Sequence, residues 1–214
     1  MVDSRIPTGG KPRYWREAIA ALSAADPVLA AVIGQSRSDG LRRRSDAFTM
    51  LARAIIGQQI SVKAADSIWA RFADLCGTVS PERVVAIGEA GLRERGMTRQ
   101  KAAYLVHIAE AAADGRLDGR RLRPLDDEAV VKELVALKGV GRWTAEMFLI
   151  FHMQRPDVLP VGDLGLRRAI GQRYADGREL SLEDIHAIAV PWRPWRTVAT
   201  WYLWRSLDPI AVDY

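Results

Sequence analysis

The chain has 214 residues, which is long enough to bury a substantial core as one domain or as two closely packed lobes. Its formal net charge of +5 is a modest excess that is compatible with a nucleic-acid partner without requiring one. The single cysteine excludes an internal disulfide, a thiolate zinc site and a four-cysteine iron–sulfur cluster, and the three histidines show no ligand spacing, so we expect neither metal nor cofactor.

The first twelve residues are polar and contain Gly and Pro, without the apolar core of a signal peptide. We expect residues 1–12 to form a flexible tail that precedes a folded unit at 13–214. No apolar run in the chain approaches the length of a membrane span. We therefore expect a monomer without a membrane partner in the cytoplasm, associated with the nucleoid if the source is bacterial.

Apolar residues recur at helical spacing through most of the chain, and alternating strand patterns are rare. Helix starts are marked by Ser80 before a proline, by Asp126 or Asp127, and by a capping box at 181–184. The longest irregular piece is 114–127. We predict an all-α protein of roughly nine or ten helices, with the clearest periodicity at 15–22, 48–60, 64–75, 101–113, 128–137, 143–153, 164–174 and 197–207.

The segment 137–145 joins two of these helical patterns through a Gly-Val-Gly turn. Glycines permit a tight link between helices and remove side chains that would keep a phosphate from the backbone amides. The unpaired amides at the start of the second helix then point toward that phosphate. A plain helix–helix turn is the alternative. The pattern favours DNA contacts from Gly139, Val140, Gly141, Arg142 and Thr144.

Asp163 follows Trp143 by twenty residues and precedes the helix that begins at Leu164. We expect its side chain to cap that helix. Amide hydrogen bonds favour the charged form of a carboxylate, and a charged carboxylate stabilises a cationic, oxocarbenium-like sugar. Capping and catalysis are therefore compatible roles for this residue.

Four segments together resemble the helix-hairpin-helix DNA glycosylases, in that family's order: 55–61, 137–145, 159–166 and 192–196. The resemblance runs from about Tyr14 to Leu207 and is strongest to the DNA-3-methyladenine glycosylase II branch, in a compact form without an N-terminal β-rich lobe. It implies a two-lobed fold with the active-site cleft between the lobes. Lobe one would hold roughly 47–160, and lobe two roughly 13–46 with 161–214.

The resemblance assigns roles to particular side chains. It implies that Asp163 is the catalytic carboxylate and that Trp143 and Trp204 line a pocket for the base. Met147 shares a helical face with Trp143 at i, i+4 and is a further candidate for this pocket, with core packing as the favoured alternative. The family members that also nick the backbone carry a nucleophilic lysine where this chain has Trp143, and Lys138 lies on the other side of the turn. A monofunctional enzyme without lyase activity is therefore implied.

Further DNA contacts follow from the same resemblance. Gln58 and Gln59 resemble residues that approach the minor groove, and Arg99 lies in a loop, 96–101, that carries a wedge residue in relatives. Which side chain fills the gap left by a flipped base is open. The alternative for each glutamine is helix packing through amide hydrogen bonds.

The implied function is base-excision repair of double-stranded DNA that contains alkylated purines such as 3-methyladenine. Hydrolysis of the N-glycosidic bond would leave an abasic site. The residue before Asp163 is Gly162 where the inducible bacterial form has a second acid, and Leu164 follows where some relatives have an aromatic residue, so the substrate range stays open. Two alternatives remain: a non-catalytic DNA-binding module, and a glycosylase for oxidised or mismatched bases.

Overall fold

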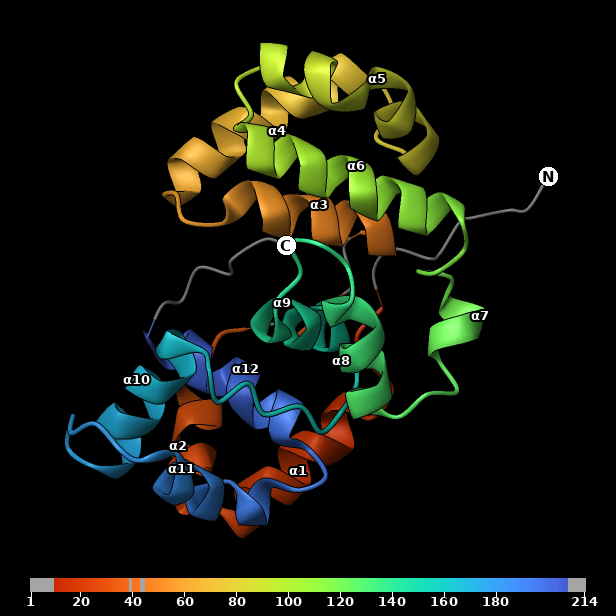
Figure 1. The fold of residues 1–214 in the computed structure, drawn as a ribbon. Coiled ribbons are helices and arrows are strands. Elements are labelled where there is room, and N and C mark those ends of the chain that lie inside the picture. Colours follow the sequence, from red (N-terminus) through yellow and green to blue (C-terminus); the bar gives the residue numbers. More distant parts are fainter. Residues whose placement is uncertain (1–9, 39, 43–44, 208–214) are drawn as a thin grey trace. The chain divides into compact units, whose positions relative to one another are not determined.

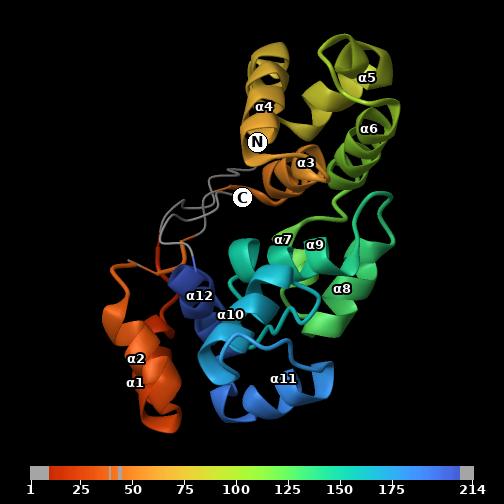
Figure 2. The same cartoon turned by 90° about the vertical axis from the view of Figure 1, so that its left-hand side faces the viewer.

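The computed structural model describes residues 10–38, 40–42 and 45–207, and these contain helices and no strand (Figures 1 and 2). The predicted all-α fold is confirmed. Residues 1–9 of the expected tail lie outside the described residues. Twelve α-helices occur in the described ranges, more than the nine or ten expected.

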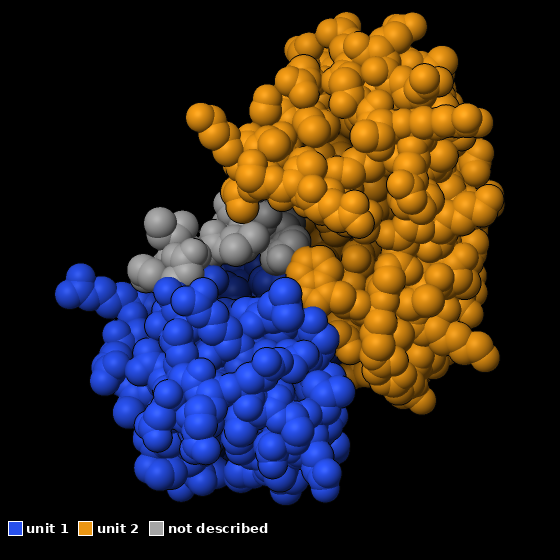
Figure 3. All heavy atoms as spheres, turned by 60° about the vertical axis from the view of Figure 1, so that its left-hand side comes forward, with its two compact units in different colours: residues 1–44, 149–213 blue, residues 45–148, 214 orange. Residues whose placement is uncertain are grey.

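The chain forms two compact units, coloured separately in Figure 3: unit 1 contains residues 1–44 and 149–213, and unit 2 contains residues 45–148. The elements of unit 1 are α1 (Trp15–Ala25), α2 (Pro27–Gln35), α10 (Leu164–Tyr174), α11 (Leu182–Ile188), the 3₁₀-helix η2 (Val190–Trp192) and α12 (Arg196–Leu207). Those of unit 2 are α3 (Ala47–Gly57), α4 (Val62–Cys76), α5 (Pro81–Glu94), α6 (Arg99–Ala113), α7 (Gly119–Leu122), α8 (Asp127–Val135) and α9 (Arg142–Met147). A π-helical segment, η1 (Phe148–His152), continues α9 at the point where the units divide.

Unit 1 is organised around α12, which packs against α1, α2 and α10. A buried carboxylate, Asp26, joins three of its elements. Its Oδ1 accepts the amides of Val28 and Leu29 at the start of α2, and its Oδ2 accepts the Tyr174 hydroxyl and the Trp192 indole N–H, both at 2.8 Å. Burial, together with the bond to Asp26, raises the pKa of Tyr174 and keeps its hydroxyl a donor. The buried charge is thus fully hydrogen-bonded.

The segment before Asp163 is tied to the start of α12. The Arg196 guanidinium donates to both carboxylate oxygens of Asp157, at 2.6 and 2.9 Å. The Thr197 hydroxyl donates to the Arg155 carbonyl at 2.6 Å and accepts the Val158 amide at 3.0 Å. A two-pronged Arg–carboxylate pair has a fixed geometry, so these bonds hold the chain that leads into α10.

In unit 2, α3 and α5 both pack against α6, and α4 packs against α3 and α5. At the C-terminal end of each of α3, α4 and α5, a cationic side chain from another helix of the unit donates to a backbone carbonyl. Carbonyls at a helix end lack partners within the helix, and a positive charge there opposes the negative end of the helix dipole. The cations are Lys101 at the end of α3, Arg83 at the end of α4 and Arg71 at the end of α5.

Several helix boundaries differ from the sequence prediction. Helix α2 was not predicted, although its Asp26 cap and first-turn Pro27 are ordinary start signals. The segment 114–127 was expected to be irregular but contains the short helix α7, capped by Asp118. The helix expected at 48–60 ends at Gly57, because the backbone leaves helical angles at Gln58. The caps expected from Ser80, Asp126 and the 181–184 capping box are confirmed.

Candidate active site

Asp163 is the N-cap of α10 and is half-buried. Its Oδ1 accepts the Leu166 backbone amide at 2.7 Å, which confirms the expected capping role. The same oxygen accepts the indole Nε1–H of Trp204, on α12, at 2.9 Å. Two donors from two helices therefore fix the position of the carboxylate, and the structure brings two predicted site residues together within unit 1.

The Trp204 ring is itself held by neighbouring aromatic rings. Phe151 stacks on it with centroids 5.9 Å apart and planes 6° from parallel. Phe151 also meets the edge of Trp201, whose indole N–H donates to the Ser38 hydroxyl at 3.0 Å. Such aromatic contacts restrict ring orientation. Phe151 is half-buried and lies in the π-helical segment, a type of distortion that is frequent at functional sites.

Gly165 makes room for the bond between Asp163 and Trp204. A Cβ at this position would lie 3.1 Å from Asp163 Oδ1 and 3.6 Å from Trp204 Cδ1. Any larger side chain would therefore press on the carboxylate. Sequence reasoning did not include Gly165; the available signal was a glycine two residues after the acid, inside a helix where glycine is otherwise unfavourable.

The two glycines of the turn between α8 and α9 differ in their structural roles. Gly139 has φ +88°, and a Cβ there would lie 2.3 Å from Cδ2 of Tyr104, so the fold itself requires glycine. Gly141 is exposed, and no heavy atom within 4 Å would meet a Cβ there. Gly141 is also the N-cap of α9 and provides no side-chain cap. Packing within the protein therefore does not require glycine at position 141.

The side chains of the other expected hairpin contacts are largely engaged within the protein. Val140 is buried, and its amide donates to the Leu137 carbonyl at 3.1 Å. Thr144 is buried as well. The Arg142 guanidinium is paired with Glu128 and, at 3.1 Å, with Glu146, and its pKa is raised chiefly by the hydrogen bond to Glu128. The hairpin therefore presents mainly its backbone.

Trp143 and Met147 belong to unit 2, whereas Asp163 and Trp204 belong to unit 1. Trp143 is half-buried at the second position of α9. Met147 is 1% exposed, so its side chain is buried.

The structure places one of the two expected minor-groove glutamines against the hairpin. The Gln58 side-chain amide donates to the Gly139 carbonyl at 2.9 Å. Gln59 is exposed and has φ +57°, a left-handed conformation. Arg99 is exposed at the first position of α6. Sequence reasoning did not identify Lys101, whose ammonium donates to the backbone carbonyls of Ile56 and Gln58.

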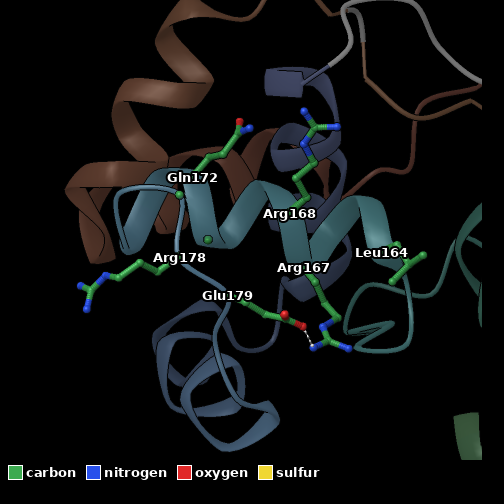
Figure 4. Close-up of a pocket in the computed structure, with 8 residues that line it drawn as sticks. Leu164, Arg167, Arg168, Gln172, Arg178 and Glu179 are labelled. Carbon is green, nitrogen blue, oxygen red and sulfur yellow. Dashed lines mark hydrogen bonds and ion pairs between the residues drawn. The ribbon is translucent and has the colours of Figure 1, made fainter.

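A shallow groove of about 300 Å³ runs along α10, starting one residue after Asp163 (Figure 4). Arg167 and Glu179 form an ion pair at 2.7 Å across its floor. Arg168 and Gln172 extend away from that pair in the same general direction. None of these residues was predicted. The lining residues are Leu164, Arg167, Arg168, Gly171, Gln172, Gly177, Arg178 and Glu179.

The described ranges contain no group of three or more His, Cys, Asp or Glu residues that could hold a metal ion. None of the helices in the same ranges combines the length and the apolar composition that crossing a membrane demands.

Comparison with known proteins identifies the family. Residues 52–194 match the model of the HhH-GPD superfamily base excision DNA repair protein. A DNA-3-methyladenine glycosylase of Bacillus subtilis is 31% identical over 76% of this chain, which spans only 57% of the length of that relative. 

Two solved structures share the fold. A DNA-3-methyladenine glycosidase from Bacillus halodurans superimposes with a TM-score of 0.81 at 34% identity, covering 89% of each chain. A 3-methyladenine DNA glycosylase of Schizosaccharomyces pombe, in complex with abasic DNA, gives 0.76 at 29% identity over 91% of this chain and 98% of that one. The extent of these matches shows that the chain belongs to the HhH-GPD superfamily of base excision DNA repair proteins.

Proposed function

We propose that the protein is a DNA glycosylase that hydrolyses the N-glycosidic bond of alkylated purines such as 3-methyladenine and leaves an abasic site. The observation that carries the proposal is the Asp163 carboxylate, held by the Leu166 amide and the Trp204 indole at the start of α10. Mere DNA binding requires no carboxylate fixed in this way. The similarity to glycosylases of this type over most of the chain supports the same conclusion.

The proposed reaction separates charge along one bond. The electron pair of the glycosidic bond leaves with the base, and the sugar develops positive charge at C1′. Asp163 stabilises that charge, because a carboxylate already oriented by two donors needs no reorganisation as the charge forms. Water then bonds to C1′ and releases its proton, which gives the abasic sugar.

Base recognition is assigned to aromatic side chains. A purine methylated at a ring nitrogen is cationic, and an indole face attracts a cation. Trp143 is half-buried and therefore retains surface for stacking. Trp204 contributes mainly by orienting Asp163. Met147, whose side chain is buried, supports the helix that carries Trp143. The positive charge of the alkylated base also weakens the bond to be broken, so no strong general acid is needed.

DNA contact is assigned to the α8–α9 turn, with Gln59 and Arg99 beside it. Gly141 leaves the first amides of α9 open to a phosphate, and such amides favour anions. Gln59 and Arg99 are exposed and can reach a duplex. Flipping the base out of the duplex costs a few kcal/mol of free energy for unstacking and unpairing, and this cost is smallest for badly paired bases. The partner is double-stranded DNA with alkylated bases, bound by a monomer in the compartment that holds the DNA.

The absence of strand cleavage is part of the proposal. Trp143 occupies the position of the nucleophilic lysine of the nicking members, and an indole cannot form an imine. Lys138 is exposed and precedes the turn. Borohydride should therefore trap no covalent complex between the protein and DNA, whereas a trapped adduct would show that another amine acts as nucleophile.

The direct test is base release by the purified protein from three duplexes measured side by side: methylated, oxidised and mismatched. We expect 3-methyladenine release from the methylated duplex, unchanged by EDTA, and little from the others. Base release from oxidised or mismatched DNA alone would instead support a glycosylase for oxidised or mismatched bases. Binding without any release would leave only a DNA-binding module.

A further inference from the structure

Lys101 connects the end of α3 to the DNA-contact hairpin. Its ammonium donates to the carbonyls of Ile56 and Gln58, at 2.7 and 2.8 Å. These carbonyls lie at the C-terminal end of α3, where a positive charge is favourable. Burial lowers the pKa of Lys101. A half-buried ammonium is thus devoted to two backbone oxygens.

Gln58 carries the connection onward from α3. Its backbone carbonyl is bound by Lys101, and its side-chain Nε2–H donates to the Gly139 carbonyl, 81 positions along the chain, at 2.9 Å. The next residue, Gln59, turns away in a left-handed conformation. The direction of the Gln58 side chain therefore depends on how its own peptide group is held.

The Gly139–Val140 peptide group is fixed at both of its polar atoms. Its carbonyl accepts from Gln58, and its N–H, on Val140, donates to the Leu137 carbonyl. The ring of Tyr104, one turn after Lys101 on α6, lies directly against the Cα of Gly139. Helix α6 thus supports the hairpin directly through the ring of Tyr104 and indirectly through Lys101, which binds the backbone of Gln58, the residue whose side chain bonds Gly139.

The direction of this peptide group matters for an incoming phosphate. A carbonyl oxygen turned outward would place a partial negative charge beside the phosphate that the amides of α9 attract. The bond from Gln58 keeps the Gly139 carbonyl directed at the Gln58 side chain. We propose that Lys101 is a positioning residue for DNA binding, which orients the hairpin through Gln58 without touching the DNA itself.

This inference rests on the proposed function of the hairpin as the phosphate contact. A positioning residue differs from a residue that contacts a phosphate directly, and the salt dependence of DNA affinity distinguishes these two roles. Each cation that neutralises a phosphate adds roughly one unit to the slope of log affinity against log salt. Loss of a positioning residue lowers affinity while leaving that slope unchanged.

The test uses the full chain and a fluorescein-labelled duplex with one tetrahydrofuran abasic analogue, with affinity followed by anisotropy across a salt series. Lys101→Met should weaken binding about tenfold at every salt concentration. Gln58→Met should do the same, and the double variant should be no weaker than either single one, because both break one connection. Lys101→Arg, which can still donate to two carbonyls, should restore most of the affinity.

Arg83→Met is the matched control, because Arg83 also ends a helix of unit 2 by donating to a backbone carbonyl but has no link to the hairpin. Its affinity should equal that of the wild type. A second readout without DNA is amide exchange at Val140, which should be about tenfold faster in Lys101→Met and unchanged in Arg83→Met. If Lys101→Met cannot be folded, Gln58→Met gives both readouts.

Three results would overturn the inference: unchanged affinity in Lys101→Met, a salt slope that falls by about one unit, or an equal loss in Arg83→Met. The first indicates no role, the second a direct phosphate contact, and the third general destabilisation. Failure of the proposed function looks different, since wild-type protein would then bind the abasic duplex without releasing base from methylated DNA.

Discussion

The two regions that carry the proposed function are built in opposite ways. In unit 1, the chemistry depends on side chains, since the carboxylate of Asp163 is held by the indole of Trp204 and that ring by Phe151. In unit 2, the hairpin depends on the backbone, since the side chains of Val140 and Thr144 are buried.

Because the two regions are built differently, they require different substitutions as tests. A side-chain site is probed by isosteric replacements that remove one charge or one donor. A backbone site responds only to substitutions that add a Cβ or move a peptide group. Substitutions in one region should therefore change the rate of base release, and those in the other should change DNA affinity.

The largest effect is expected from Asp163→Asn. The amide oxygen of asparagine can still accept from Leu166 and Trp204, so the cap and the fold are retained. The negative charge is lost, and single-turnover base release should fall by about a hundredfold or more. Affinity for the abasic duplex should stay within about twofold of wild type. A comparable loss of affinity would show that Asp163 serves binding rather than chemistry.

Substitutions of the two hairpin glycines test the backbone site of unit 2. Gly141→Ala should fold normally, because a Cβ there meets nothing, and yet weaken DNA binding about tenfold by keeping the phosphate from the amides. Gly139→Ala should instead destabilise the fold by about 1–3 kcal/mol through its positive φ and the clash with Tyr104. Thermal unfolding and anisotropy distinguish them. Wild-type affinity in Gly141→Ala would argue against phosphate approach at this turn.

Trp204→Phe tests whether the indole N–H of Trp204 orients the Asp163 carboxylate. Phenylalanine keeps a ring to stack on Phe151 but has no N–H for Asp163. We expect base release to slow by about fivefold with little change in DNA affinity. Trp201→Phe is the control, because it removes an indole N–H that donates to Ser38 instead. Equal slowing in both variants would assign the effect to packing.

The smallest effect is expected at the groove of unit 1. Arg168 is exposed on α10 and lines the groove next to Arg167, which is ion-paired with Glu179. If DNA passes over this groove, Arg168→Gln should weaken binding about two- to threefold and lower the salt slope by about one unit. Arg93→Gln, an exposed change on α5, is the control. No change in slope would remove the groove from the DNA contact.

Much of this arrangement could be predicted from local sequence. Asp163 as a cap and the glycine turn are features of neighbouring residues, and helical spacing is visible along the chain. The bond from Trp204 to Asp163 joins residues 41 positions apart, and the bond from Gln58 to Gly139 joins residues 81 apart. Such pairs depend on how the helices pack, which the periodicity of a single sequence does not specify.

Two residues show where that limit lies. Lys101 looks like an ordinary exposed cation at the start of a helix, and only the fold turns its ammonium onto the end of α3. Met147 shares a helical face with Trp143, which suggested either a pocket or core packing, and its side chain is buried. A helical face identified from spacing does not reveal which neighbour covers it.

The central claim is that Asp163 stabilises positive charge on the sugar, and it can be measured without any damaged base. The duplex for this measurement carries either a cationic pyrrolidine analogue of the abasic sugar or the neutral tetrahydrofuran analogue. Wild-type protein should prefer the cationic analogue by about tenfold or more, and Asp163→Asn should abolish that preference. Equal preference in wild type and variant would contradict the account, because the carboxylate would then not act on the sugar charge.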